Sequence, residues 1–115
     1  MKNPLDPRHI RRKILIEELF KGDFHPQKID QEAQIILNQK DFLDAEIEKA
    51  APEFPIEKIN KVDLAILRLA FYEILTVKKE PAKVVIDEAI ELAKEYGGQS
   101  SSAFVNGALD HFIKK

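Results

Sequence analysis

Apolar side chains recur every three or four positions along most of the chain, the spacing that places them on one face of an α-helix. The first such stretch begins at Asp6-Pro7, because an aspartate caps free helical N–H groups and a proline suits the first turn. Its apolar surface consists of Ile10, Ile14, Leu15, Ile16, Leu19 and Phe20. The pattern predicts that this helix ends at Gly22 and that a loop follows over residues 23–28.

A second apolar stripe lies between Asp30, a suitable helix cap, and the prolines at 52 and 55, which close it. The stripe consists of Ala33, Ile36, Leu37, Leu43, Ile47 and Ala50. Polar residues around Asp41 interrupt it. The pattern therefore predicts either one helix or two helices that break near Asp41.

The stretch from Ile59 to Val77 is apolar on more than one side, which is typical of a helix at the centre of a bundle. A fourth helix is predicted to begin at Pro81. It should end at Gly97-Gly98, because glycine readily adopts the left-handed conformation that terminates helices.

A fifth helix is predicted from the serines at 100–102, which are candidate caps, to the end of the chain. Asn106-Gly107 resembles a hairpin turn, but the helical period around it outweighs that signal, and we expect Gly107 to permit close helix packing. No stretch alternates as a strand does. The expected fold class is all-α, a compact bundle of about five to six helices in a single domain over residues 1–115.

Composition narrows the class of protein. Hydrophobic residues make up 44% and charged residues 33% of the 115 residues, which is typical of a soluble globular chain. Cysteine is absent, no apolar run approaches the roughly 18 residues of a membrane span, and no signal peptide is recognisable, so we expect a cytoplasmic location. Phosphate-loop, dinucleotide and nucleophile motifs are missing and the histidines are scattered. We expect no enzymatic activity, metal or cofactor.

Positive charge is concentrated at the start of the chain. Residues 1–13 hold Lys2, Arg8, Arg11, Arg12 and Lys13 against Asp6 alone. Cations in the first turns of a helix oppose its dipole, and like charges three or four residues apart repel. An external anion such as an RNA phosphate would compensate, since guanidinium binds phosphate bidentately. The alternative is a solvated basic face, or pairing with acidic residues elsewhere in the protein.

Aromatic residues flank the predicted connection between the last two helices. Tyr96 precedes it, Phe104 follows it, and Ser100 lies between them. Aromatic rings beside basic groups hold single-stranded RNA by stacking on its bases. The alternative is that both rings belong to the core.

Charged residues on the apolar helices need an explanation too. Arg68 lies on the central helix, where a buried charge requires a partner, and we expect Glu88 or Glu91 to pair with it. The acidic residues of the fourth helix are expected to form a solvated face, and they are Asp87, Glu88, Glu91 and Glu95.

Three blocks in the second half of the chain resemble the NusB family. They are KVDLAILRLAFYEIL (Lys61–Leu75), VVIDEAIELAKEYG (Val84–Gly97) and SSAFVNGALD (Ser101–Asp110), and they occur in the family's order with tight spacing. The arginine-rich first helix also fits. The chain departs from the family pattern at Asp87, where an asparagine is usual, and the region between the first and third helices is shorter.

The resemblance implies a fold of two packed helical bundles that binds the boxA element of nascent RNA with the ribosomal protein NusE. That complex modifies RNA polymerase so that ribosomal RNA operons are read through. Members also form homodimers. The implied RNA-binding residues are Arg8, Arg11, Arg12, Lys13, Tyr96, Ser100 and Phe104. Phe20 and Asp63 match positions that face the protein partner, although a core role for Phe20 and dipole stabilisation by Asp63 are the alternatives.

Two other functions remain open from the sequence. A protein-interaction or dimerisation module would have no RNA affinity, and it would not need the basic first helix. An accessory domain of an RNA-modifying enzyme is the third hypothesis, because a NusB-like domain precedes the catalytic domain of an RNA cytosine methyltransferase.

Overall fold

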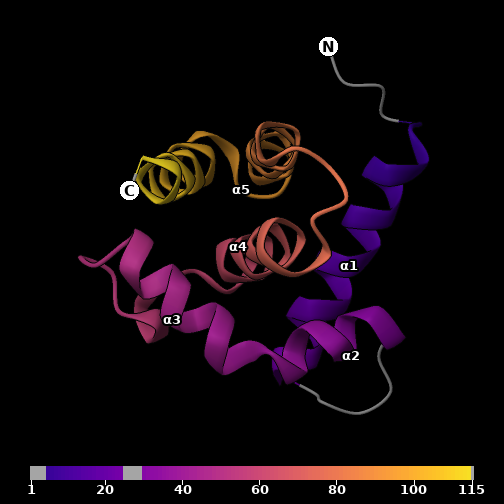
Figure 1. Ribbon diagram of the computed structural model, residues 1–115, viewed down its shortest axis with the longest axis horizontal. Coiled ribbons are helices and arrows are strands. Elements are labelled where there is room, and N and C mark those ends of the chain that lie inside the picture. Colours follow the sequence, from indigo (N-terminus) through magenta and orange to yellow (C-terminus); the bar gives the residue numbers. More distant parts are fainter. Residues whose placement is uncertain (1–4, 25–29, 115) are drawn as a thin grey trace.

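Five α-helices and two short helical turns make up the structure, a computed structural model that describes residues 5–24 and 30–114 (Figure 1). The α-helices are α1 (Pro7–Phe24), α2 (Gln31–Asn38), α3 (Lys40–Ala50), α4 (Lys61–Tyr72) and α5 (Ala82–Ile113). A 3₁₀ turn, η1 (Ile56–Lys58), precedes α4, and a π-helical turn, η2 (Glu73–Val77), extends it. The described residues form no strand, so the all-α prediction is confirmed.

The helix α4 lies at the centre of the fold and contacts α1, α3 and α5 (Figure 1). Every residue from Asp63 to Tyr72 is buried, which confirms the expectation of a central helix. Asn60 caps this helix, because its side chain accepts hydrogen bonds from the backbone N–H groups of Val62 and Asp63. The start of α4 is therefore fixed both by its buried residues and by the cap from Asn60.

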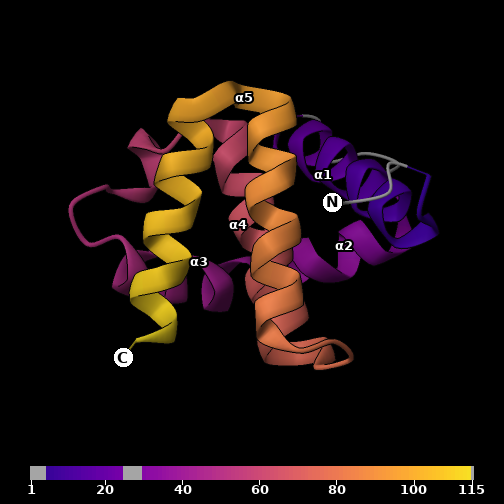
Figure 2. The same ribbon diagram turned by 90° about the horizontal axis from the view of Figure 1, so that it is seen from above.

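The helix α5 is a bent pair of arms, because the backbone leaves the helical conformation at Gly98 (φ 75°, ψ −157°). Figure 2 shows residues 82–97 and 99–113 running antiparallel, side by side. Gly98 adopts a conformation that only glycine tolerates well. Gly97 is required for a different reason: a Cβ there would lie 2.0 Å from Ser101 Oγ. The predicted break at the two glycines is correct, but the serines at 100–102 lie inside the second arm and do not cap it.

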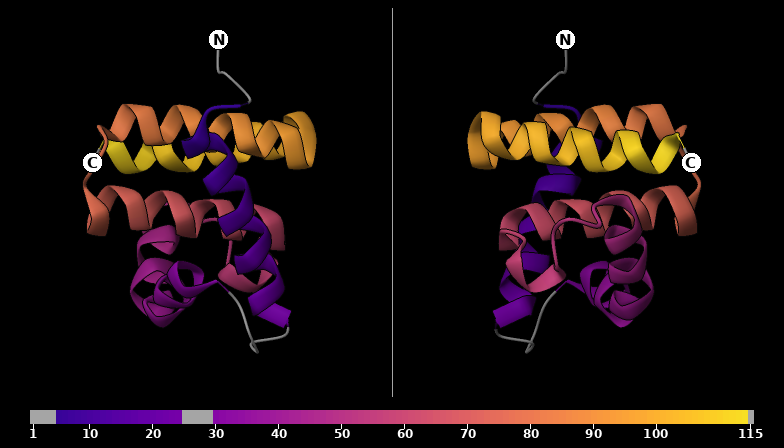
Figure 3. Two further views of the ribbon diagram at one scale, coloured as in Figure 1. Left: turned by 90° about the vertical axis from the view of Figure 1, so that its right-hand side faces the viewer. Right: turned by 90° about the vertical axis from the view of Figure 1, so that its left-hand side faces the viewer.

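The helix α1 crosses α4 and the first arm of α5 (Figure 3). Asp6 caps it by accepting a hydrogen bond from the Arg8 N–H at 2.8 Å, as predicted. The predicted end at Gly22 is wrong, because α1 continues to Phe24. A glycine costs a helix only about 1 kcal/mol relative to alanine, which one more half-turn can offset. Residues 23–24 of the predicted loop are thus helical, and residues 25–28 lie outside the described residues.

Asp30 caps α2 as predicted, accepting hydrogen bonds from Glu32 N and Ala33 N. The stripe predicted for residues 30–50 is two helices, α2 and α3, and they break at Gln39, among the polar residues next to Asp41, which confirms the two-helix alternative. A helix end reflects where backbone hydrogen bonds stop, and side-chain polarity fixes that point only to within about two residues.

Specific side chains tie α3, α4 and the second arm of α5 together. Arg68 of α4 is paired with Asp44 of α3 through Nε at 2.8 Å and Nη2 at 2.9 Å, so the predicted choice of Glu88 or Glu91 missed this partner. The rings of Phe71 and Phe112 meet edge to face at 4.6 Å. Gly107 is exposed, and a Cβ there would meet no atom within 4 Å, so its predicted role in close packing is wrong.

Candidate nucleic-acid interface

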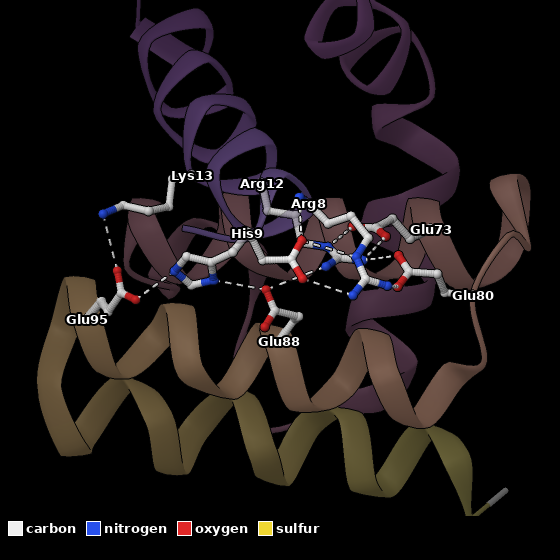
Figure 4. A network of polar contacts seen from close by, with 9 residues as sticks. Arg8, His9, Arg12, Lys13, Glu73, Glu80, Glu88 and Glu95 are labelled. Carbon is white, nitrogen blue, oxygen red and sulfur yellow. Dashed lines mark hydrogen bonds and ion pairs between the residues drawn. The ribbon is translucent and has the colours of Figure 1, made fainter. Parts of the chain in front are cut away.

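Arg12 of α1 is the centre of a polar network (Figure 4). The network joins α1 to η2, to the segment before α5 and to α5 itself. The Arg12 side chain is only 7% exposed, and its Nε and Nη2 each donate to Glu73 at 2.8 Å. Nη2 also donates to Glu80, and Nη1 lies 3.5 Å from Glu88. Burial by itself lowers the pKa of Arg12, but the hydrogen bond to Glu73 and the other carboxylates raise it by more, so the net pKa is above its ordinary value and the guanidinium stays charged.

His9 lies buried between two carboxylates of α5 (Figure 4). Its Nδ1 is 3.0 Å from Glu88 and its Nε2 is 2.8 Å from Glu95. Hydrogen bonding to Glu88 is the largest cause that raises the pKa of His9 above its ordinary value, and Glu95 adds to it. An imidazolium can donate to both carboxylates at once. The expectation that Glu88 belongs to a solvated face is therefore wrong, because Glu88 is buried against α1.

The other cations of α1 lie at the rim of this network. The Arg8 side chain is 64% exposed and pairs with Asp6 and Glu80. Lys13 is 43% exposed and lies 3.3 Å from Glu95. Arg11 forms a bidentate pair with Asp30 at 2.8 and 2.9 Å and also contacts Glu32.

These ion pairs overturn the sequence-based argument for an external anion. The three arginines and Lys13 each have a carboxylate partner within the protein, and those carboxylates supply the compensation that the helix dipole and charge repulsion demand. The sequence could not reveal this, because the partners of Arg12 lie 61 and 68 residues away. The side chain of Arg12 is thus buried within the protein, whereas those of Arg8, Arg11 and Lys13 are substantially exposed.

Tyr96 connects this network to the corner of α5. Its hydroxyl donates a hydrogen bond to Glu17 of α1 at 2.7 Å. Burial raises the pKa of Tyr96, and the bond to Glu17 raises it further, so the phenol remains protonated and a donor. The ring is partly buried, and its position one residue after Glu95 places the corner beside Lys13 and His9.

A cavity of about 510 Å³ opens at that corner, between the start of α4 and the two arms of α5. Tyr96, Ser100 and Phe104, which the sequence singled out, all line it. The remaining lining residues are Phe54, Lys58, Ile59, Asn60, Val62, Asp63, Gly97 and Ser101. The structure therefore brings together the three residues predicted at the connection. It adds an aromatic ring, Phe54, which lies just before η1, and a cation, Lys58, which lies in η1. Sequence reasoning missed both residues, because they belong to a separate turn.

Phe104 is partly buried, so neither the core nor the surface alternative describes it fully. Its ring meets that of Phe54 edge to face, with centroids 5.0 Å apart. The same two rings also line a second, more apolar hollow of about 610 Å³, together with Ala50, Pro52, Gly107 and other residues. The pair thus forms a wall shared by the two hollows.

Asp63 is the buried charge of the cavity. Asp63 is only 6% exposed, and its Oδ1 has no hydrogen-bond partner among the described residues. Burial raises the pKa of Asp63, and the neighbouring Ser101 hydroxyl acts in the opposite direction. Phe20, predicted to share a protein-binding surface with Asp63, is 38% exposed on α1 and is not among the residues that line this cavity.

Neither a metal site nor a membrane span is present in the part of the chain that the structure describes. No three histidine or acidic side chains within it gather in a way that could hold a metal ion. None of the helices within it is long and apolar enough to cross a bilayer.

Comparisons with known proteins identify the family. The model of the NusB family matches residues 10–114. A transcription antitermination protein NusB from Chloroflexus aggregans is 51% identical over 78 residues, which cover 66% of this chain and 52% of that protein. The matched segment thus spans about half of that relative's length. The NusB of Alkaliphilus oremlandii is 36% identical over 94% of this chain and 91% of that protein.

Solved structures agree with the sequence comparison. NusB of T. maritima superposes with a TM-score of 0.80 at 32% identity, covering 100% of this chain and 94% of that one. A crystal structure of antitermination factors NusB and NusE in complex with dsRNA has a TM-score of 0.79 at 20% identity, covering 93% of this chain and 96% of that one, which shows a shared fold. The match over residues 10–114 and the resemblance in three helices lead to one conclusion: this chain belongs to the NusB family.

Proposed function

We propose that this protein is a transcription antitermination factor that binds boxA-type single-stranded RNA together with the ribosomal protein NusE and promotes ribosomal RNA transcription. Membership of the NusB family supports the proposal, as do relatives named transcription antitermination proteins. Within this proposal the protein acts in the cytoplasm as part of an RNA polymerase antitermination complex, and no residue has a catalytic role.

The observation that carries the proposal is one cavity lined by Tyr96, Ser100 and Phe104, where the Tyr96 hydroxyl is bonded to Glu17 of α1. Aromatic rings give RNA bases a stacking surface, and nearby cations hold the phosphates. Arg8, Arg11 and Lys13 are the cations proposed for this role, since each is substantially exposed. On binding, a phosphate oxygen replaces a carboxylate oxygen as the acceptor of the same N–H groups.

Arg12 has a different part in the proposal. Its guanidinium is buried beneath three carboxylates, so it positions α1 rather than touching RNA. The neighbouring exposed cations then lie at fixed points along the helix. This assignment differs from the RNA-contact role that the family resemblance implies for Arg12.

Phe20 is the residue proposed to contact the protein partner, because its large apolar ring is exposed on α1 away from the cavity. Exposed aromatic rings are typical anchors of protein interfaces. Asp63 was expected at the same surface, but it is buried beside the cavity.

The proposal is tested by titrating labelled boxA-type RNA with the protein, with and without NusE, at two salt concentrations. The double variant Arg8→Ala/Lys13→Ala should bind RNA more weakly and show a shallower salt dependence, by about 0.7 per lost phosphate contact on a logarithmic plot. The matched control is Lys40→Ala/Lys83→Ala, which removes two exposed cations elsewhere. An absence of RNA affinity in the wild type, with and without NusE, would overturn the proposal.

A further inference from the structure

His9 is buried with a carboxylate at each of its two ring nitrogens (Figure 4). Nδ1 lies 3.0 Å from Glu88, and Nε2 lies 2.8 Å from Glu95. A neutral imidazole carries a single N–H, so it can donate to only one carboxylate, and its other nitrogen would direct a lone pair at the second. Only the charged ring satisfies both contacts. The position of His9 is therefore one that a proton stabilises.

The two carboxylates depend on that proton to different degrees. The Glu88 side chain is 7% exposed and has a second cation, because Arg12 Nη1 lies 3.5 Å from the same oxygen that faces His9. The Glu95 side chain is 38% exposed, and its other cation among the described residues is Lys13, at 3.3 Å. Glu95 thus holds one buried cation and one exposed cation, each through a different oxygen.

Lys13 is one of the cations proposed to bind an RNA phosphate, and Glu95 would lose it on binding. His9 is then the cation that remains at Glu95. A charged His9 balances the carboxylate, whereas a neutral His9 would leave an unbalanced anion close to the phosphate, and like charges repel. The RNA-bound protein therefore needs the proton of His9 more than the free protein does.

The other charged groups around His9 are paired elsewhere. A small hollow of about 60 Å³ lies beside the ring, and its remaining lining residues are Asp6, Arg8, Arg12, Glu80, Val84 and Glu88. The two arginines among them are bound to carboxylates other than Glu95. The balance of charge at Glu95 therefore rests on His9 once Lys13 has turned to a phosphate.

We infer that RNA binding is coupled to the protonation of His9, a positioning residue whose charged ring holds Glu95 while Lys13 binds an RNA phosphate. This inference rests on the proposed RNA-binding function and adds its regulation by pH. Hydrogen bonding to Glu88 is the largest cause that raises the pKa of His9 above its ordinary value, and Glu95 adds to it. RNA affinity should be greatest below that raised pKa and should fall as the pH rises through it, because the neutral form must take up a proton to bind.

The test measures the affinity of the protein for labelled boxA-type RNA from about pH 6 to about pH 9 at constant ionic strength. NusE is present throughout, so its own titration is common to all variants. The wild type should lose about fivefold in affinity over this range, a modest coupling between two sites. Glu95→Gln removes the carboxylate that needs the proton and keeps its size. It should lose this pH dependence and bind RNA more tightly than the wild type at the alkaline end.

His9→Gln keeps a polar side chain between the carboxylates but cannot be charged. It should bind RNA more weakly than the wild type at the acidic end, with a flat profile, and circular dichroism at each pH checks that it is folded. Two controls should keep the wild-type profile. Asp87→Asn removes a carboxylate from an exposed position of α5, and His111→Gln removes an exposed histidine from its second arm.

The outcomes separate this inference from the proposed function. A wild-type RNA affinity that stays constant over the whole range overturns the inference and leaves the function standing. The inference also fails if Glu95→Gln keeps the wild-type pH dependence. It fails too if Glu95→Gln binds RNA more weakly than the wild type at every pH, since His9 and Glu95 would then only hold α1 in place. If the wild type binds no boxA-type RNA at any pH, both fail together.

Discussion

Arg12 of α1 and Glu73 at the end of α4 form a partly buried bidentate ion pair, with Nε and Nη2 each 2.8 Å from a carboxylate oxygen. Glu80 and Glu88 surround the same guanidinium. The two residues lie 61 positions apart in the chain, so the pair joins elements that are distant in sequence. It determines where α1 crosses the rest of the bundle, and the exposed cations of α1 depend on that position.

Replacing Arg12 with methionine should destabilise the protein by about 3–5 kcal/mol, because the buried Glu88 and the partly buried Glu73 and Glu80 would lose their shared cation. Arg8→Met is the matched control and should cost less than about 1 kcal/mol, since the Arg8 side chain is largely exposed. Urea unfolding followed by circular dichroism measures both values. Equal losses in the two variants would contradict the structural role of Arg12.

The stability of the protein should fall as the pH rises above neutrality, because of His9. Hydrogen bonding to Glu88 and Glu95 raises the folded-state pKa of His9 above the unfolded value of about 6.5. The stabilisation is complete below that value, where the histidine is charged in both states. It is lost as the pH passes through the folded pKa, because the folded protein must then give up a proton.

Thermal unfolding midpoints would reveal this loss if they are measured from about pH 6, just below the unfolded pKa, up to about pH 9. The charged groups that surround His9 are Glu88, Glu95, Arg12 and Lys13. His9→Gln should flatten the profile. A profile with the same slope in this variant would show that another group is responsible.

Gly97→Ala should destabilise the protein by about 1–3 kcal/mol, which is typical of overpacking. The added Cβ would lie 2.0 Å from Ser101 Oγ and 2.6 Å from Ser101 Cβ, so the corner of α5 must shift. The second variant Ser101→Gly removes both atoms and should recover part of the loss when combined with Gly97→Ala. Additive effects in this double-mutant cycle, measured by urea unfolding, would argue against the contact.

Phe104→Ala should weaken RNA binding by about 1–3 kcal/mol, the value of one stacked base. Tyr96→Phe keeps the ring and removes only the hydroxyl bond to Glu17, so its RNA affinity should stay within about twofold of the wild type. Fluorescence titration with boxA-type RNA distinguishes the two. A larger effect of Tyr96→Phe than of Phe104→Ala would show that the hydroxyl, and not stacking, matters at this corner.

Phe20→Ala should reduce affinity for NusE at least tenfold, as expected for an aromatic anchor, while RNA binding by the protein alone stays unchanged. Calorimetric titration with NusE provides the measurement, and Phe42→Ala, another exposed ring on a different helix, is the control. Unaltered affinity for NusE would remove Phe20 from the partner surface.

The sequence predicts the helices well where a local signal sets their limits. Asp6 and Asp30 cap α1 and α2 as expected, and Gly98 bends α5 where two consecutive glycines allow it. A helix end without such a cap is shifted, as at Gly22, where α1 continues to Phe24. The local pattern is sufficient for these features because backbone hydrogen bonds within a helix involve only near neighbours.

The sequence does not predict which charged residues pair when they are far apart in the chain. Arg68 is bound to Asp44 and His9 to Glu88, and nothing in the spacing of either pair predicts contact. The aromatic corner was predictable because Tyr96, Ser100 and Phe104 lie within nine positions of one another. Phe54 completes the wall of the cavity from a separate turn, and only the folded chain reveals it.

Tyr96 belongs to two places at once: its ring lines the cavity, and its hydroxyl is bonded to α1. Because one ring serves both places, any coupling between occupancy of the cavity and the docking of α1 is reciprocal, so each changes the other by the same factor. A ligand in the cavity should slow hydrogen exchange in α1, although it touches another helix.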